Sequence, residues 1–496
     1  MISKNNYKTQ LLFISVFVLV NVVIFSFSVS KYNYYSGKYQ SPTFWNASDG
    51  QRYWGVALNL AETKSFTVKN VNQETIKRAI QATYSHEKLN DNPLKRAGPI
   101  PAVLFSIPIA LFGLDKAAVW IVMIQCILLY VSGVGAKRLG RPFRANENVI
   151  QGLIIFNPSL INLCHHAQSD IVFMFLLTIF LVLVSKLLGR PNNLSVRNFI
   201  CIGVIAGLLP LARPLGFYLI LAAPMLIIIA FVLSTRWSQV RWKKLLVGLS
   251  MSGLLACVVM TPWAVRNYHV MNHFGLTHSE QIMMKWHYRA FERNRMSKHT
   301  GIDVQDYLRK YRTENNCKLE GECKTAVIQA YVHAVWDSGI ENISGALLVS
   351  WGKLFFSGGV SQLTKYLGFS TIDLGNFLAA DRTWTEEITK LFIYIRGNYA
   401  PFFNLLLVGV LFTTVCRVFG LIGLVKIVTT RKTMVHTIFN LGTMAVLLSM
   451  YLFSGISRFR APLEPILALF AAIGISWVLS YLRASKDSIL EAESSH

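Results

Sequence analysis

Long apolar runs separated by short polar connections recur along the whole chain, and they restrict its fold more than any other feature. Leu11 to Val29, Ile171 to Leu188 and Leu245 to Ala264 are examples, and each approaches the roughly 20 residues that cross a hydrocarbon core of about 30 Å as a helix. Further runs are Leu215 to Leu233, Met434 to Phe453 and Leu463 to Leu482. Only 15% of the residues are charged, against about a quarter in soluble domains. The pattern predicts an all-α polytopic membrane protein.

The basic residues of the chain gather in the short connections between these runs. Lys plus Arg number 49 against 25 Asp plus Glu, a formal net charge of +24. The basic connections are the N-terminus with Lys4 and Lys8, AKRLGRPFR at 136–144, KLLGRPNNLSVR at 186–197, TRWSQVRWKK at 235–244 and KIVTTRK at 426–432. Placing all of them in the cytoplasm satisfies the positive-inside rule. This solution has about ten spanning helices with both termini inside, and it explains the positive charge without nucleic acid.

The same topology leaves two long segments on the outer face, 31–116 and 265–400. Each contains an apolar stretch, GPIPAVLFSIPIALFG at 98–113 and ISGALLVSWGKLFF at 343–356. Counting either as a span would turn the following basic loops outward, so both are predicted to be interfacial helices. The remaining parts are a first spanning helix in 1–30, spanning helices two to seven in 117–264, spanning helices eight to ten in 401–482, and a cytoplasmic tail in 483–496.

Ionisable residues collect at the predicted outer ends of the helices. They are Asp49, Arg52, Tyr53, Lys95, Arg96, Asp170, Arg213, Arg266 and Arg458, delivered by six separate segments. Ionisable groups at membrane depth are costly, which makes them functional candidates. Simpler explanations stay open: Asp49 with Ser48 is suited to cap a helix beginning near Gln51, and arginines snorkel to lipid head groups. The adjacent His165 and His166 point to different helix faces and make a poor metal pair.

This combination of residues suits chemistry on a phosphorylated lipid. Guanidinium groups near the head-group plane bind phosphate oxygens through forked, charge-assisted hydrogen bonds. A nearby carboxylate is able to accept a proton from an attacking hydroxyl or amine. Together they would transfer a group from a phosphorylated lipid. The phosphate is already a good leaving group, so the enzyme need only stabilise its charge.

Several short motifs in order resemble the GT-C glycosyltransferases of family 39, which include protein O-mannosyltransferases and the lipid A aminoarabinose transferase. The motifs are SDGQRYWGVALNL at 48–60, LKRAGPIPAVLFSIPIALFG at 94–113, AKRLGR at 136–141, HAQSDIVF at 166–173, AGLLPLARPLGF at 206–217, TPWAVRNY at 261–268 and SRFRAPLEP at 457–465. The resemblance extends from Leu11 to about Leu482, with 270–400 least matched. It implies a GT-C fold in a bacterial inner membrane.

The resemblance also implies an activity: inverting transfer of a sugar from a polyprenyl-phosphate donor, on the periplasmic face, to an envelope lipid, glycan or protein. Asp49 would be the catalytic carboxylate and Asp170 a second one. The donor phosphate would be bound near Lys95, Arg96, Arg213 and Arg266. Arg52 and Tyr53 would support the loop or touch the donor, and Arg458 would lie at the rim of the lipid groove. No cofactor or metal is expected. The segment 265–400 would select the acceptor.

Two other functions stay open at this point. An O-antigen-type polymerase or ligase is also polytopic with essential arginines, but we expect that class to depend on its late outer loop. A lipid flippase or transporter typically shows internal repeats and polar residues at the midplane, whereas the polar residues here gather at one face. Cys317 and Cys323 in CKLEGEC are suitable for a local disulfide in an oxidising compartment, and the sequence leaves that pairing undecided.

Overall fold

The structure is a computed structural model. It describes residues 4–32, 50–64, 98–192, 194–234, 237–271, 274–277, 280–294, 304–314, 324–360, 363–364, 367 and 400–494. Within these ranges every regular element is a helix, which confirms the predicted all-α class. Six of the described helices are long and apolar enough to cross a membrane, so the chain is a multi-pass membrane protein. These six spans are Tyr7–Phe27, Lys116–Phe143, Asp170–Gly189, Trp242–Val270, Ala400–Val428 and Arg458–Ser485.

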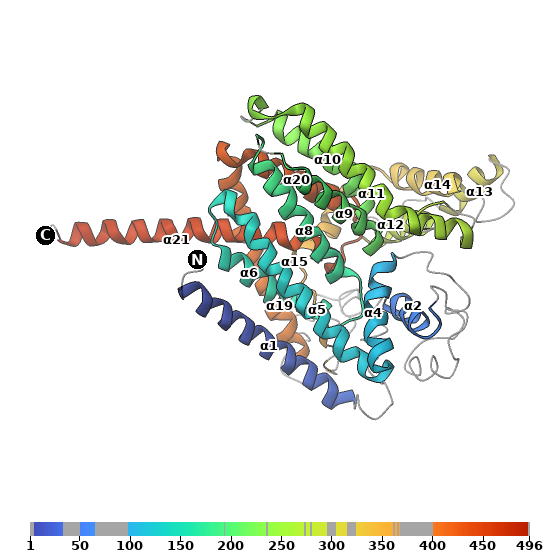
Figure 1. The fold of residues 1–496 in the computed structure, drawn as a ribbon, viewed down its shortest axis with the longest axis horizontal. Coiled ribbons are helices and arrows are strands. Elements are labelled where there is room, and N and C mark those ends of the chain that lie inside the picture. The colour runs from blue at the N-terminus through green and yellow to red at the C-terminus, as the bar shows by residue number, and fades with distance from the viewer. Residues whose placement is uncertain are drawn as a thin grey trace.

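The six long helices carry most of the bundle, and shorter helices fill the spaces between them (Figure 1). The long ones are α1 (Lys4–Tyr32), α5 (Leu114–Gly140), α8 (Asp170–Gly189), α11 (Trp242–Met271), α19 (Ala400–Val428) and α21 (Glu464–Ser494). The shorter ones include α6 (Glu147–Ile155), α7 (Pro158–Cys164), α9 (Val196–Ala212), α10 (Gly216–Val232) and α20 (Met434–Ser449). The other four of the predicted spans therefore correspond to helices shorter than a full crossing.

The predicted span at 149–163 is a broken helix, because the sequence caps a second helix in its middle. Asn146 begins α6 by accepting the backbone N–H groups of Asn148 and Val149 at 3.0 and 3.3 Å. Asn157 then accepts the N–H of Ser159 at 3.0 Å, and Pro158 occupies the first position of α7. Proline is tolerated there because the first N–H groups of a helix lack an intrahelical partner.

Glycines let two pairs of helices in the bundle approach closely. A methyl group on Gly203 of α9 would lie 2.7 Å from the carbonyl oxygen of Ser252 in α11. A methyl group on Gly423 of α19 would lie 1.9 Å from a carbonyl oxygen of α21. One on Gly474 of α21 would lie 1.9 Å from a carbonyl oxygen of α19. Small residues are common at such crossings. The hydrophobic effect does not drive helices together within lipid, so their association depends on close van der Waals packing.

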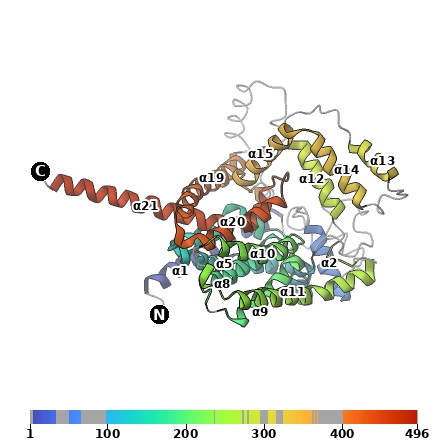
Figure 2. The same ribbon diagram turned by 90° about the horizontal axis from the view of Figure 1, so that it is seen from above.

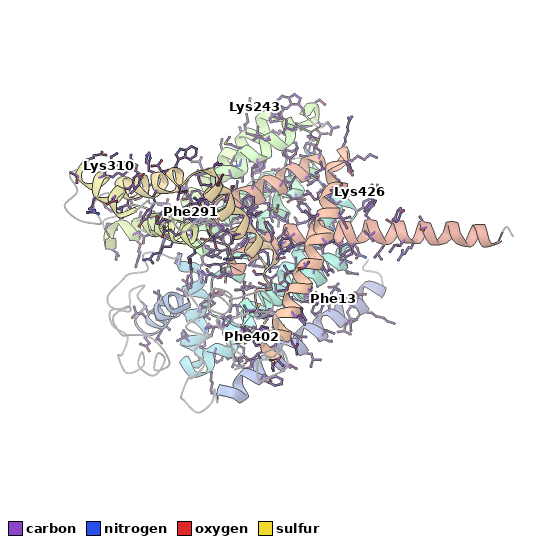
Figure 3. All side chains as sticks on the ribbon, turned by 180° about the vertical axis from the view of Figure 1, so that it is seen from behind. Phe13, Lys243, Phe291, Lys310, Phe402 and Lys426 are labelled. Atoms are coloured by element: carbon purple, nitrogen blue, oxygen red, sulfur yellow. The ribbon has the colours of Figure 1, made fainter. Side chains whose placement is uncertain are left out.

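The molecule has two distinct ends. The two termini lie at one end, which also carries the basic connections, as Lys243 and Lys426 illustrate in Figure 3; we call this the terminal end. The opposite end carries α2 (Gly50–Thr63), α4 (Pro99–Phe112), α12 (Glu280–Asn294), α13 (Val304–Glu314), α14 (Lys324–Asp337) and the start of α15 (Ile340–Phe356), and we call it the site end (Figures 1 and 2). Helices α12–α15 have an apolar core of their own, which includes Tyr288, Phe291 and Tyr331.

The two stretches predicted as interfacial helices are α4 and α15. In α4, Val103, Ile107 and Leu111 form an exposed apolar stripe with four-residue spacing, while the opposite face is buried against the protein. In α15, Ile340 and Leu348 are exposed to a similar degree. Apolar stripes of this kind fit contact with lipid, so the interfacial placement of both helices stays a prediction that their exposure favours.

Candidate functional site

The centre of the site end is an ion pair between Asp170 and Arg213. Asp170 is the first residue of α8, and Arg213 directly follows α9, so the pair joins two neighbouring helix ends. Nη1 of Arg213 donates to Oδ1 of Asp170. The Asp170 side chain is 2% exposed and that of Arg213 is 11% exposed. The start of α8 favours a carboxylate, because the positive end of the helix dipole lies there.

A second guanidinium lies beside the first on a shared aromatic ring. Arg213 is 5.4 Å from the centroid of Phe459, and Arg458 is 5.2 Å from the same centroid. The other aromatic neighbour of Phe459 is Tyr451, whose ring stacks on it at 4.4 Å with an interplanar angle of 7°. Both arginines are thus held by cation–π contacts at the same place. With Asp170, the two arginines form a charged cluster at this helix end.

Helix α2 contributes Tyr53 to this site. Tyr53 is 4% exposed and packs in an apolar cluster with Phe105 of α4 and Leu211 of α9. Burial alone would lower the pKa of Arg213, but the carboxylate of Asp170 raises that pKa above its ordinary value. Tyr53 reaches the end of α9 through the cluster that includes Leu211, and Tyr451 stacks on the Phe459 ring that Arg213 contacts. Helices α2, α8 and α9 and the segment 451–459 therefore meet near Arg213.

Arg266 lies in the last turns of α11, at the site end of the molecule. Its guanidinium is 4.7 Å from the ring centroid of Trp263, and its Nη1 donates to Oδ1 of Asn267 at 2.9 Å. Nε1 of Trp263 donates to the carbonyl of Leu276 at 3.1 Å, which fixes the indole. Trp263 belongs to the same apolar cluster as Tyr53, and this cluster connects Arg266 to the site.

The remaining predicted residues lie at the edge of what the structure describes. Asp49, Lys95 and Arg96 lie outside the described residues, as do Cys317 and Cys323. Arg52 belongs to α2, but its side chain is not described. Two described neighbours still locate the segments. Gly50 begins α2, and Gly98 is so close to Leu211 that a methyl group on it would lie 2.0 Å from the carbonyl oxygen.

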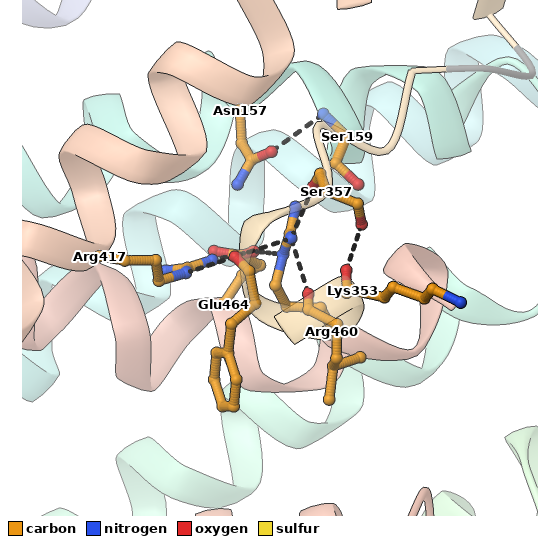
Figure 4. Close-up of polar contacts among 9 residues, drawn as sticks. Asn157, Ser159, Lys353, Ser357, Arg417, Arg460 and Glu464 are labelled. Carbon is orange, nitrogen blue, oxygen red and sulfur yellow. Dashed lines mark hydrogen bonds and ion pairs between the residues drawn. The ribbon is translucent and has the colours of Figure 1, made fainter. Parts of the chain in front are cut away.

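Beneath the site is a buried network of charges, drawn in Figure 4. Oε1 of Glu464 accepts from Nη2 of Arg417 at 2.7 Å and from Nε of Arg460 at 2.6 Å. Nη1 of Arg460 also donates to the carbonyls of Leu354 and Ser357, both at 2.8 Å. Arg460 thereby caps the C-terminal end of α15 and joins the outer helices to the spanning bundle.

Sequence reasoning found part of this arrangement and missed the rest. It selected Arg458 but overlooked Phe459, whose ring contacts both arginines, and Tyr451, whose ring stacks on Phe459. It also gave no role to Glu464 or Arg417. One signal was readable: Arg460 and Glu464 have the i, i+4 spacing that brings two helical side chains together.

A polar cluster around His165 and His166 ties α1, α5 and α7 together. Nε2 of His165 lies 3.1 Å from Oδ1 of Asn21, and Nε2 of His166 lies 3.1 Å from Oδ1 of Asn162. Nε2 of Gln125 donates to the carbonyl of His166 at 2.8 Å. Within the described ranges, no three His, Cys, Asp or Glu side chains gather in a way that would hold a metal ion. The histidines form structural hydrogen bonds between helices.

Among solved structures, the chain is similar to two membrane proteins. The chain is similar to the archaeal oligosaccharyltransferase AglB from Archaeoglobus fulgidus, in complex with an inhibitory peptide and a dolichol-phosphate, with TM-score 0.48 and 14% identity over 95% of this chain and 51% of that one. The apo form matches at the same TM-score and identity. ArnT from Cupriavidus metallidurans, bound to undecaprenyl phosphate, matches with TM-score 0.36 and 14% identity over 93% of this chain and 77% of that one.

The present chain spans about half the length of the archaeal oligosaccharyltransferase. No protein-family model matches the chain, and no curated protein matches its sequence. The functional argument below therefore depends on the geometry of the site.

Proposed function

We propose that the protein is a glycosyltransferase of the GT-C type that moves a sugar from a polyprenyl-phosphate donor to an envelope lipid, glycan or protein, with inversion. The observation that carries the proposal is the pair Arg213 and Arg458, which both contact the ring of Phe459, with the carboxylate of Asp170 bound to Arg213. Guanidinium groups held in this way are suited to bind the oxygens of a lipid phosphate.

Three further cations are proposed to complete the phosphate site. Lys95 and Arg96 directly precede the segment that Gly98 anchors against Leu211, two residues before Arg213. We propose that both cations approach the same helix end. Arg266 approaches from α11 through the cluster shared by Trp263 and Tyr53. In this arrangement, positive charges surround the phosphate and stabilise the charge that develops as it leaves.

The proposed general base is Asp49. It precedes the first residue of α2, and Tyr53 of the same helix is buried beside Arg213. A carboxylate at the start of α2 would gain from the positive end of the helix dipole and would face the sugar end of a donor held by Arg213. It would accept the proton of the attacking acceptor hydroxyl or amine as the glycosidic bond to phosphate breaks. Arg52 is proposed to support this loop.

Asp170 is proposed as a positioning residue. Its Oδ1 already accepts a hydrogen bond from Arg213, and it is almost fully buried. A carboxylate so occupied orients the guanidinium toward the donor and limits its movement. The acceptor is proposed to enter from 265–400, because α12–α15 lie beside the site and are joined to it through Arg460.

The proposed location is a bacterial inner membrane, with the site end in the periplasm and both termini in the cytoplasm. The basic connections at the terminal end support this orientation. Cysteine labelling of intact cells would test it. In a variant whose seven native cysteines are replaced by serine, Lys310→Cys on α13 should react with an impermeant maleimide, whereas Lys243→Cys should react only after lysis. The reverse pattern would refute the orientation.

The transfer reaction is tested by mass spectrometry of envelope glycolipids and glycans in strains with matched membrane levels of protein. The strains are a deletion, and the deletion carrying wild type, Asp49→Asn, Arg458→Gln or Glu147→Gln. Glu147 is a carboxylate at the terminal end paired with Arg141, so it controls for loss of a carboxylate far from the site. A sugar-sized mass should disappear on deletion and return with wild type and Glu147→Gln.

Asp49→Asn should fail to restore the mass, and Arg458→Gln should restore it only partly. Full restoration by Asp49→Asn would refute the proposed base. Accumulation of a lipid-linked sugar on the cytoplasmic leaflet without loss of transferase activity in extracts would favour a flippase. A change only in polymer length would favour a polymerase or ligase.

A further inference from the structure

A pocket of about 380 Å³ lies at the terminal end, far along the bundle from the proposed active site. Its floor is apolar and includes Ile427 and Ile473, both nearly buried. Its rim carries Arg144 and Lys426 together with the hydroxyls of Thr430, Thr433, Ser476 and Ser480. The pocket forms where α19 and α21 separate after their close crossing at Gly423 and Gly474. An apolar floor with a cationic rim fits an amphipathic anion.

The backbone at Arg144 is held in an unusual conformation. Its φ of 55° and ψ of 29° are left-handed, a region that costs most residues about 1 kcal/mol and that glycine adopts freely. The turn is fixed by hydrogen bonds from the N–H of Arg144 to Arg141 and from Ala145 to Gly140. This turn places the charged side chain of Arg144 in the lining of the pocket.

The electrostatics around the pocket also favour an anion. Thr433 lines the pocket and directly precedes α20, and its hydroxyl donates to the carbonyl of Thr430 instead of capping the helix. The N–H of Met434, the first residue of α20, donates to the carbonyl of Arg431, and the positive end of the α20 dipole lies beside the pocket. The end of α19 has the opposite polarity, but Lys426 in its last turn offsets it. The nearby carboxylate of Glu147 is paired with Arg141 at 3.1 Å.

The surface beside the pocket suits acyl chains. Val425 and Val428 of α19 are 67% and 64% exposed, and Leu479 and Leu482 of α21 are about half exposed. In a spanning bundle, such residues face lipid. Trp477, which lines the pocket, is also half exposed, as expected for an aromatic residue at the head-group level.

We propose that this pocket binds the phosphate of an anionic membrane phospholipid, with Arg144 and Lys426 contacting the head group and the acyl chains lying along α19 and α21. The site would hold these two helices together at the membrane surface. It lies at the opposite end from the proposed transferase site and does not depend on it.

The test uses the full-length protein purified in mild detergent and native mass spectrometry with added lipid. The probes are phosphatidylglycerol and phosphatidylcholine with the same acyl chains, and inorganic phosphate at millimolar concentration serves as the competitor. The variants are Arg144→Gly, Lys426→Gln and the double variant. Arg144→Gly keeps the left-handed turn, so it removes the charge without straining the fold. Lys432→Gln, in the same loop but outside the pocket lining, is the charge-matched control.

Wild type should retain phosphatidylglycerol in preference to phosphatidylcholine. Each single variant should weaken that retention about fivefold, as expected for loss of one cation near a membrane surface, and the double variant should abolish the preference. Without lipid, Arg144→Gly should not lower the unfolding temperature, because glycine adopts the left-handed conformation freely. The proposal is overturned if the double variant keeps the preference, if Lys432→Gln loses as much, or if inorganic phosphate displaces the lipid.

Discussion

Asp170 and Arg213 form a buried ion pair that connects the first turn of α8 to the end of α9. Removing one partner of such a pair leaves an uncompensated charge, which costs about 3–5 kcal/mol, whereas replacing both by neutral groups costs much less. The pair is therefore coupled energetically. It also links the stability of the bundle to the geometry of the proposed phosphate site.

The first prediction is that Asp170→Asn lowers the stability of the protein by about 3 kcal/mol. The variant Arg213→Gln should destabilise it as well, because it leaves the carboxylate unpaired. The double variant should be more stable than the sum of the two single losses implies. The measurement is unfolding of the purified proteins in detergent as a double-mutant cycle. Strictly additive losses would show that the pair contributes no coupling.

The second prediction concerns Glu464, which lies between Arg417 and Arg460. Glu464→Gln would leave two buried guanidiniums without a counter-charge, and a loss of about 3–5 kcal/mol is expected. Because Arg460 also binds the carbonyls that end α15, the outer helices should loosen first. Limited proteolysis between α12 and α15 should therefore accelerate.

The matched control for Glu464→Gln is Glu341→Gln, because Glu341 is an exposed carboxylate in the first turn of α15. It should change the unfolding temperature and the proteolysis rate little. If both variants behave alike, the buried network does not hold the outer helices.

Structural features that depend on residues close together in the sequence were predictable, whereas features that depend on contacts between separate segments were not. Apolar runs and basic connections are local features, so the sequence was sufficient to predict the helices and to place Asp170, Arg213 and Arg458 at one end. The stacking of Tyr451 on Phe459 depends on how η5 (Ser457–Leu463) folds back along the end of α20, and no local pattern encodes it. The pairing of Glu464 with Arg417 is of the same kind, because it joins two helices far apart in the chain.

The third prediction concerns Gly98, which precedes α4 and packs against the backbone of Leu211. Gly98→Ala would place a methyl group 2.0 Å from a carbonyl oxygen, so α4 must move away from the end of α9. We expect a clear loss of stability and, since Arg96 lies two residues earlier, a loss of transferase activity. Gly253→Ala in α11 is the control, because nothing lies within 4 Å of its added methyl group. Equal effects from both substitutions would contradict the close packing at Gly98.

The fourth prediction is a loss of stability at acidic pH that originates at His165. Burial, with a smaller contribution from His166, lowers the pKa of His165 to about 3, from 6.5 in the unfolded chain. Below pH 6.5 the unfolded state binds a proton that the folded state rejects. The contribution of His165 to stability is therefore fully present above that pH and falls by about 1.4 kcal/mol per pH unit as pH decreases toward 3.

Unfolding temperatures of wild type and His165→Gln between pH 4 and pH 8 would measure this pH dependence. The glutamine variant should show a shallower slope, while His269→Gln, at an exposed position, should match wild type. Parallel slopes for wild type and His165→Gln would exclude His165 as the source.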